Sequence, residues 1–311
     1  MKVTVAICAK NSESYVRKCL ESIKAQSVAP AKILLIDDHS NDNTTGIAQE
    51  LKVPVVLNEG HKLYQARNTA LKYCNTDILA FIDSDCIAHE HWVKNIMRVF
   101  KEQNVAGGTG AYISEQPHNL SSWIYYMWFI VETEKTGFTQ GIVAGNSYFK
   151  TAALRSVGGW IPLPLTAAED VYIAIKLVQS GYKLWFDKEV IVKHTYDRNI
   201  TRVMKKMIMS GKDIVIMMKT ANFLTDSLWW YTLCIPLVSL SGLVSLILLI
   251  KSRLIGILAI TLVFGGTYLY LWHRFESMGK TLPRFIARWI IIWPYSIGIL
   301  LGLIEDKHRE Q

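Results

Sequence analysis

Short apolar runs and helical patterns alternate along the first third of the chain. The predicted strands are Val3–Ala9, Ile33–Asp37, Val53–Leu57 and Ile78–Asp83, and the predicted helices are Glu13–Gln26, Thr45–Leu51, Tyr64–Tyr73 and His89–Glu102. Strand–helix alternation at this spacing implies crossover connections and a mainly parallel sheet. The pattern therefore predicts an α/β fold, in which the loops after the strands meet at the edge where open sheets bind ligands.

The middle of the chain is mixed. Leu120–Val131 is apolar and aromatic, but a dozen residues are too few to cross a bilayer, so a core or interfacial helix is expected. The other predicted elements are strands over Gly141–Phe149, Lys183–Phe186 and Val190–Val192, and helices over Thr151–Val157 and Ala167–Gln179. Residues 1–195 are therefore expected to form one catalytic-sized domain.

The last third has the pattern of a membrane region. Leu228–Ile250 and Leu254–Trp272 carry no charge, and about 20 apolar residues cross the hydrocarbon core. A third span is predicted at 285–304, with Arg288 reaching the interface. Residues 196–225 hold a basic amphipathic helix, which is typical of the membrane interface, and an ordinary core-facing helix is the alternative. The tail is 305–311, and the membrane region as a whole is 226–304.

Composition and charge agree with an integral membrane protein. Half of the residues are hydrophobic, and much of the net charge of +8 lies at 193–219, where seven Lys/Arg favour lipid headgroups or phosphorylated ligands over nucleic acid. The Lys and Arg residues near the spans number eleven on the side of the membrane where the N-terminus would lie and four on the opposite side. The positive-inside rule therefore predicts a cytoplasmic catalytic domain, at the plasma membrane if the protein is prokaryotic. Five cysteines without a CxxC pair agree with a reducing compartment.

The strongest chemical signal is FIDSDC at 81–86. An apolar strand delivers Asp83 and Asp85 into a loop, where residues two apart point the same way. Two such carboxylates repel each other unless a cation lies between them. Hard oxygen ligands suit Mn²⁺ or Mg²⁺, which in turn bind a diphosphate. A solvated acidic turn is the alternative, and the surrounding sequence decides between the two.

That surrounding sequence resembles glycosyltransferase family 2. Five motifs follow one another in the family's order and spacing over 1–195: VAICAKNSESYVRKCLESI, ILLIDDHSNDNT, NEGHKLYQARNTALKYCNTDILAFIDSD, VAGNSYFKTAALRSVGGW and AAEDVYIAIKLVQSGYKLWFDKEVIVKH. The resemblance implies a GT-A nucleotide-diphospho-sugar transferase fold, and the membrane region resembles the lipid-linked and exopolysaccharide-building branch in architecture. The implied reaction is inverting, metal-dependent transfer of one sugar from a UDP- or GDP-sugar. The implied acceptor is a membrane lipid, either polyprenyl or dolichyl phosphate or a lipid-linked saccharide.

The resemblance also implies roles in donor binding. Asn11 and Glu13 match the turn near the base and ribose, and Asp37 and Asp38 match the acidic pair at the base. Arg67 matches a residue near the base or phosphates, and Asp83 matches the residue that contacts the ribose or sugar. Asp85 matches the metal ligand. A histidine at the place of His194 contacts the metal or diphosphate in part of the family, although a lone histidine is more often structural.

Asp170, in Ala-Glu-Asp, matches the catalytic base of the family. Its neighbour Glu169 matches a structural or acceptor-facing residue. One carboxylate within reach of the acceptor oxygen is enough to remove its proton, and an acceptor that is already an ionised phosphate would only need positioning. The alternative is a pair of acidic residues favoured by a helix dipole. Arg198 and Arg202 are candidates for the diphosphate, an acceptor phosphate or lipid headgroups.

Three observations limit the function. Residues 195–222 contain no Gln and no Trp, so the Gln-x-x-Arg-Trp motif of processive family members is missing and long polymers are not expected. A nucleotidyltransferase would need a Gly-rich loop after the first strand, and CAKNSES has no glycine. A non-catalytic membrane scaffold with a degenerate domain is disfavoured by the retained acidic residues. The sequence leaves the sugar, the acceptor and the oligomeric state open.

Overall fold

The structure is a computed structural model that describes residues 1–101, 105–114, 120–129, 136–162, 168–195, 199–223, 227–260, 263 and 278–304. The chain divides into two compact units. The first unit contains residues 1–116 and 130–195, and the second contains 117–129 and 196–311. Helix α5 (Leu120–Phe129) therefore belongs with the C-terminal part of the chain, although strands of the first unit precede and follow it in sequence.

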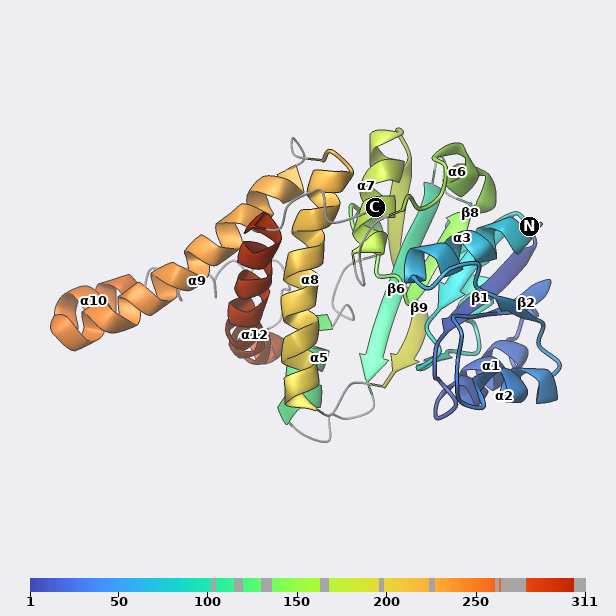
Figure 1. The fold of residues 1–311 in the computed structure, drawn as a ribbon, viewed down its shortest axis with the longest axis horizontal. Coiled ribbons are helices and arrows are strands. Elements are labelled where there is room, and N and C mark those ends of the chain that lie inside the picture. Colours follow the sequence, from blue (N-terminus) through green and yellow to red (C-terminus); the bar gives the residue numbers. More distant parts are fainter. Residues whose placement is uncertain are drawn as a thin grey trace. The chain divides into compact units, whose positions relative to one another are not determined.

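A mixed sheet forms the centre of the first unit (Figure 1). Its strands are β1 (Val3–Ala9), β2 (Lys32–Asp37), β3 (Val55–Leu57), β4 (Ile78–Ile82), β5 (Cys86–Ala88), β6 (Val105–Ser114), β7 (Gly137–Thr139), β8 (Asn146–Lys150) and β9 (Lys183–His194). The order is β3-β2-β1-β4-β8-β6-β9-β5, and β7 pairs with β9. The predicted parallel pairing holds for β1 to β4. Strand β6, which was not predicted, also runs parallel to β9, whereas β5, β7 and β8 run antiparallel to their neighbours.

Helices cover both faces of this sheet. They are α1 (Val16–Lys24), α2 (Thr44–Glu50), α3 (Leu63–Tyr73), α4 (Trp92–Val99), α6 (Thr151–Ser156) and α7 (Glu169–Gln179). Alternate β1 residues, such as Val5 and Ile7, pack in one core with α1, α2 and α4, as the two-residue period of a strand requires. On the opposite face, the ring of Phe81 in β4 packs edge-on against Phe149 and Trp160.

Strand β6 has no counterpart among the predicted elements, because its three glycines weaken the strand pattern. The structure shows why glycine is needed there. A β-carbon at Gly108 would overlap the backbone oxygen of Trp185, and one at Gly110 would overlap that of Val190. Close approach of β6 to β9 therefore selects residues that intrinsic strand propensity disfavours.

Strand β9 is one continuous element where two short strands were predicted. Its pairing with β6 shifts register between Gly110, which pairs with Asp187, and Ala111, which pairs with Ile191, next to the polar residues 187–189. The polar stretch that interrupts the sequence pattern is thus a local irregularity within the strand. Its last residue, His194, reaches the loop edge of the sheet.

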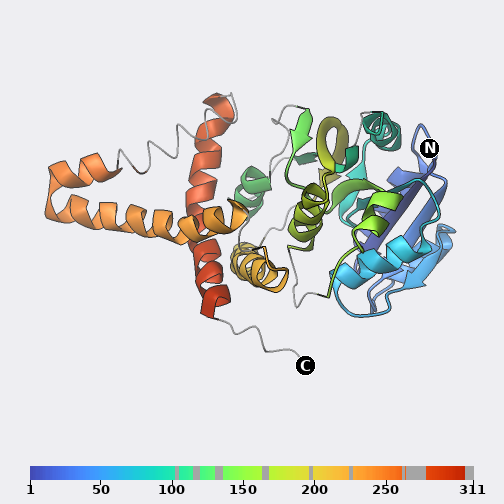
Figure 2. The ribbon, with the colours of Figure 1, turned by 90° about the horizontal axis from the view of Figure 1, so that it is seen from above.

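Within its described residues, the second unit contains α5 and four longer or apolar helices. These are α8 (Ile200–Thr220), α9 (Ser227–Lys251), α10 (Arg253–Ile260) and α12 (Met278–Ile304). Figure 2 shows α8 nearly end-on while α12 runs across the view, so the two helices cross. Glycines permit their close approach, since a β-carbon at Gly211 would overlap the Tyr295 backbone and one at Gly298 would overlap the Ile208 backbone. Lys219 Nζ of α8 also donates to the carbonyl of Gly302 at 2.9 Å.

One helix among the described residues is long and apolar enough to cross a membrane. It is Thr232–Lys251, 20 residues within α9, and outward-facing side chains such as Leu237 and Ile250 are exposed. Trp289–Ile304 of α12 is a shorter apolar stretch. Of the predicted span 254–272, the structure describes α10 and residue 263, and the remainder lies outside the described residues, as does the tail 305–311.

Candidate functional site

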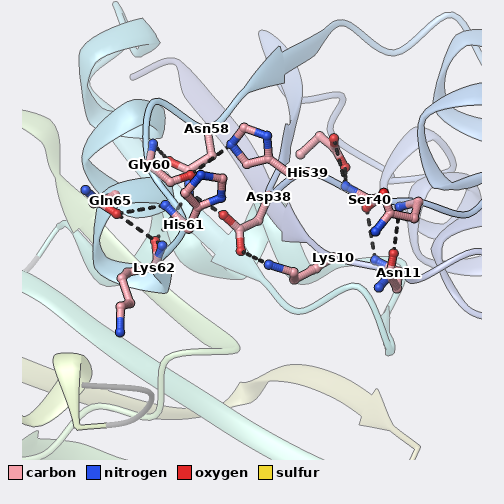
Figure 3. A network of polar contacts seen from close by, with 12 residues as sticks. Lys10, Asn11, Asp38, His39, Ser40, Asn58, Gly60, His61, Lys62 and Gln65 are labelled. Atoms are coloured by element: carbon pink, nitrogen blue, oxygen red, sulfur yellow. Dashed lines mark hydrogen bonds and ion pairs between the residues drawn. The ribbon is translucent and has the colours of Figure 1, made fainter. Parts of the chain in front are cut away.

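The loops that follow β1, β2 and β3 meet at the C-terminal edge of the parallel strands. The donor-binding residues were predicted from the sequence to lie at this edge. Figure 3 shows Asp38 between Lys10 and Asn58. The Asp38 carboxylate accepts hydrogen bonds from Lys10 Nζ at 3.1 Å and from Asn58 Nδ2 at 2.7 Å. It remains partly exposed, so a ligand can reach it.

Asn11, Glu13 and Asp37 organise the two loops. Asn11 has a positive φ of 50°, donates its N–H to Ser40 Oγ at 3.0 Å, and accepts from the Asn41 N–H at 2.8 Å. Glu13 Oε2 accepts the Asn43 N–H at 2.8 Å. Asp37 is buried and accepts the Ser40 N–H at 3.2 Å. These three predicted residues therefore shape the loops around Asp38.

A pair of histidines beside Asp38 was not singled out from the sequence. The rings of His39 and His61 lie 4.1 Å apart between centroids, with an interplanar angle of 36°. His39 Nε2 lies 3.0 Å from the Gly60 carbonyl oxygen, which can only accept, so this nitrogen carries the hydrogen. One ligand atom from each of Asp38, His39 and His61 lies within 4.8 Å of the others. The sequence feature that could have indicated this pair is the position of both histidines in polar loops that follow strands.

A second group of potential metal ligands surrounds Asp85. Antiparallel pairing places Cys86 of β5 opposite His194 of β9, which brings His194 Nε2 to 3.5 Å from Asp85 Oδ2. Ligand atoms of Asp85, Cys86 and His194 lie within 4.8 Å of one another. Burial raises the pKa of Cys86 well above its usual range, and its sulfur is a softer donor than Mn²⁺ or Mg²⁺ prefers. The carboxylate of Asp85 and the imidazole of His194 are the donors of this group that suit a divalent cation.

Asp83 and Asp85 interact electrostatically, as their spacing predicts. Burial, followed by the Asp85 charge, raises the pKa of Asp83. The Asp83 backbone is fixed by a hydrogen bond from its N–H to the Gly145 carbonyl at 3.2 Å. A bound cation would offset the repulsion between the two carboxylates.

Arg67 and Glu169 form a buried ion pair that joins α3 to the start of α7. Arg67 Nε donates to Glu169 Oε1 at 3.2 Å, and the two residues are only 2% and 5% exposed. The guanidinium also lies 4.9 Å from the centroid of the Phe81 ring. Arg67 thus lies beneath the start of α7, with almost no surface open to a donor.

Asp170 lies in the first turn of α7, which begins after Ala168 in the left-handed conformation, φ 68°. Its Oδ2 accepts the Ala144 N–H at 3.3 Å and its Oδ1 accepts the Val171 N–H at 2.8 Å. Burial raises the pKa of Asp170, and burial together with the Asp170 charge raises the pKa of Glu169 to about 7. Residues 144 and 145 therefore connect Asp170 with Asp83.

Two predicted arginines remain, Arg198 and Arg202. Arg198 lies outside the described residues. Arg202 is an exposed residue in the first turn of α8, in the second unit, and its N–H donates to Asn199 Oδ1 at 3.1 Å. Their roles stay predictions.

Comparison with known protein sequences agrees with the arrangement of the first unit. Residues 4–157 match the model of the family described as Glycosyl transferase family 2. An O-antigen chain rhamnosyltransferase, RfbN of Salmonella typhimurium, is 28% identical over 213 residues, which cover 63% of this chain and 67% of the relative. A dolichyl N-acetyl-alpha-D-glucosaminyl phosphate 3-beta-D-2,3-diacetamido-2,3-dideoxy-beta-D-glucuronosyltransferase of Methanococcus voltae is 23% identical and spans 98% of both chains.

A solved structure shares the fold. The mannosyltransferase PcManGT from Pyrobaculum calidifontis, in complex with GDP-Man and Mn²⁺, has a TM-score of 0.62 at 14% identity. The match covers 97% of this chain and 87% of that protein. At this identity the likeness shows the GT-A-like α/β fold alone.

Proposed function

Since the chain belongs to glycosyltransferase family 2 and is a glycosyltransferase, we propose that it transfers one sugar, with inversion, from a UDP- or GDP-sugar to a lipid-linked membrane acceptor. The observation that carries the proposal is the gathering of Asp38, Asp83, Asp85 and Asp170 in one unit at the loop edge of the sheet. The named relatives are transferases, which favours this function over a scaffold or a nucleotidyltransferase.

The donor is proposed to lie along the loops after β1, β2 and β4. Asp38 is the partly exposed acidic group that accepts a base N–H, within a frame built by Asn11, Glu13 and Asp37. Asp83 faces the ribose or sugar. The ligand set of Asp85 and His194 fits Mn²⁺ or Mg²⁺, and the solved mannosyltransferase of similar fold carries Mn²⁺. Such an ion, when bound, neutralises charge on the leaving diphosphate.

Asp170 is proposed as the base for a hydroxyl acceptor. Inversion requires the acceptor oxygen to attack the anomeric carbon opposite the diphosphate, so one carboxylate suffices. Both Asp170 oxygens are oriented by backbone N–H groups, which fixes the carboxylate before substrate binds. With an ionised phosphate acceptor, the same carboxylate would only position the attacking oxygen.

The acceptor is proposed to be polyprenyl or dolichyl phosphate, or a saccharide carried on such a lipid. Two relatives build on O-antigen chains or dolichyl-linked sugars according to their names. The exposed apolar helix Thr232–Lys251 supports membrane insertion, and the Lys/Arg asymmetry supports a cytoplasmic catalytic domain. The proposed domains are 1–195, 196–225 and 226–304, with α5 packing among the helices of the second unit.

The test is direct transfer by the full-length protein in detergent or vesicles. A panel of radiolabelled UDP- and GDP-sugars is offered with a lipid extract, and labelled lipid is separated and counted. We expect one donor to label a lipid product in the presence of Mn²⁺ or Mg²⁺, with an anomeric configuration opposite to that of the donor. No labelled lipid from any donor, or a product of retained configuration, would contradict the proposal.

A further inference from the structure

The buried ion pair of Arg67 and Glu169 is more elaborate than a packing contact requires. Two contacts hold the Arg67 side chain: its Nε donates to Glu169, and its guanidinium lies over the Phe81 ring. The residue as a whole is only 2% exposed. Glu169 is fixed in turn, because its backbone carbonyl accepts Trp160 Nε1 at 3.1 Å. A buried ion pair contributes little net stability to a fold, because the cost of desolvating the two charges offsets their attraction.

Acidic groups outnumber the basic ones around this pair. Asp83 from the turn after β4 and Asp170 on α7 both interact electrostatically with Arg67, in addition to Glu169. His194 of β9 and Asp85 act on Asp83. Cys8 of β1 also faces Arg67, but burial raises its pKa to about 12, so it is neutral. Arg67 is thus the permanent positive charge among the buried carboxyl group of Glu169 and the partly buried ones of Asp83 and Asp170.

Physical chemistry predicts what the group would do without that charge. Buried carboxylates close to one another cannot all ionise, and one or more of them would hold a proton at neutral pH. A protonated Asp170 cannot accept a proton from an acceptor. Its neighbour Glu169 cannot replace it, because Glu169 is turned onto Arg67 and is 5% exposed.

We propose that Arg67, anchored by Glu169, is a positioning residue that keeps Asp170 ionised as the base. This inference rests on the proposed function. It assigns Arg67 to the acceptor side of the reaction, where its positive charge acts on Asp170 from beneath α7. The ion pair also holds the first turn of α7 against α3, so that the carboxylate of Asp170 stays aimed at the loop edge.

The test is the pH dependence of transfer to a hydroxyl acceptor, a polyprenyl-diphosphate-linked saccharide, with the UDP- or GDP-sugar that the parent uses. Arg67→Gln removes the charge but retains a buried N–H donor. We expect its acid limb in kcat to move up by about one pH unit, so that its rate deficit is about tenfold below the limb and shrinks above it. Arg67→Lys should keep the limb near that of the parent.

Glu169→Gln supplies the second arm and nearly preserves shape. It removes an ionisable carboxyl group beside Asp170 and leaves the charge of Arg67 in place, so the acid limb should stay at or below the parental position. A purely structural role would lower the rate of Arg67→Gln without moving its acid limb, and that result would overturn the proposal. An upward shift in Glu169→Gln would also overturn it, even if Arg67→Gln failed to fold.

The outcomes separate this inference from the function on which it rests. An inactive parent with every donor would contradict the proposed function itself. An active parent that loses turnover in Asp170→Asn, with an unmoved acid limb in Arg67→Gln, would contradict only the positioning role. Melting temperatures of all variants in detergent show which of them are folded.

Discussion

The backbone of Gly145 lies directly against the carboxylate of Asp83, so that a β-carbon at residue 145 would overlap that carboxylate. A side chain at residue 145 would require the Asp83 side chain to move. At Gly141, four residues earlier, an added β-carbon would meet nothing within 4 Å. The pair of glycines therefore gives a built-in comparison between a residue that restrains the site and one that does not.

Gly145→Ala should displace the Asp83 side chain while leaving the fold intact, because the obstacle is a movable carboxylate. We expect donor binding to weaken by about one decade, the scale of losing one charged hydrogen bond. Titration with the nucleotide sugar by calorimetry measures this. Gly141→Ala is the control and should bind as the parent does; equal affinity of both variants would show that Asp83 does not contact the donor.

Asp85→Asn should abolish turnover and weaken metal-dependent nucleotide binding by one to two decades, since a charge-assisted ligand of about 1.5–3 kcal/mol is lost. Binding of UDP or GDP with and without Mn²⁺ checks this. Excess EDTA should reduce the parent to the level of the variant. Full activity of the parent in EDTA would exclude a required divalent cation.

Asp170→Asn should bind the nucleotide sugar nearly as well as the parent, because the amide preserves size and stays on the acceptor side. Turnover with a hydroxyl acceptor should fall by about 10²–10⁴, the usual contribution of a general base. Initial rates at saturating donor measure the loss. A variant that keeps more than about a tenth of the parental rate would remove Asp170 from that role, whereas a mild effect confined to a phosphate acceptor would mean that the acceptor arrives ionised.

Glu169→Gln should flatten the pH dependence of stability. The folded-state pKa of Glu169 is about 7, above its ordinary value of 4.5, so the protonated form is favoured by folding. Its contribution to stability is complete below about pH 4.5 and is lost as pH rises through 7. Melting temperatures of the parent should therefore fall more between pH 5 and 7.5 than those of the variant, while Glu21→Gln, at an exposed position of α1, should behave like the parent.

The membrane topology predicts that the two ends of the chain lie on opposite sides. Three spans place a reporter fused after Gln311 outside, while a reporter fused at the N-terminus stays in the cytoplasm. Paired reporter fusions of an enzyme active only in one compartment measure both ends. A cytoplasmic C-terminus would mean two or four spans, and 285–304 would be the segment to revise.

The sequence predicted the elements whose hydrophobic period is local. Strand β1 has the predicted bounds, and α8 (Ile200–Thr220) lies within the predicted amphipathic region 196–225. Strands β5 and β7 have three residues each, too few for a period to emerge. The sequence did not predict strand β6, because its glycines are required by the close packing of β9, which lies some 75 residues further along the chain.

Site residues divide in the same way. Asp83 and Asp85 could be recognised because both follow one strand in one loop. The meeting of Asp85 with His194 depends on the pairing of β5 with β9, and that of Arg67 with Glu169 spans 102 residues. No local pattern encodes such contacts, so the buried position of Arg67 emerged only from the fold.

The membership of α5 in the second unit has a consequence for dissecting the protein. The chain enters the second unit twice, and Ile124 of α5 shares a small apolar core with Val203, Met207 and Ile291. A single proteolytic cut near residue 196 would therefore nick the chain without releasing the catalytic unit, since α5 would remain as a tether. A fragment ending at residue 195 would also contain α5 without the helices that pack against it, and the exposed apolar surface of α5 would favour aggregation.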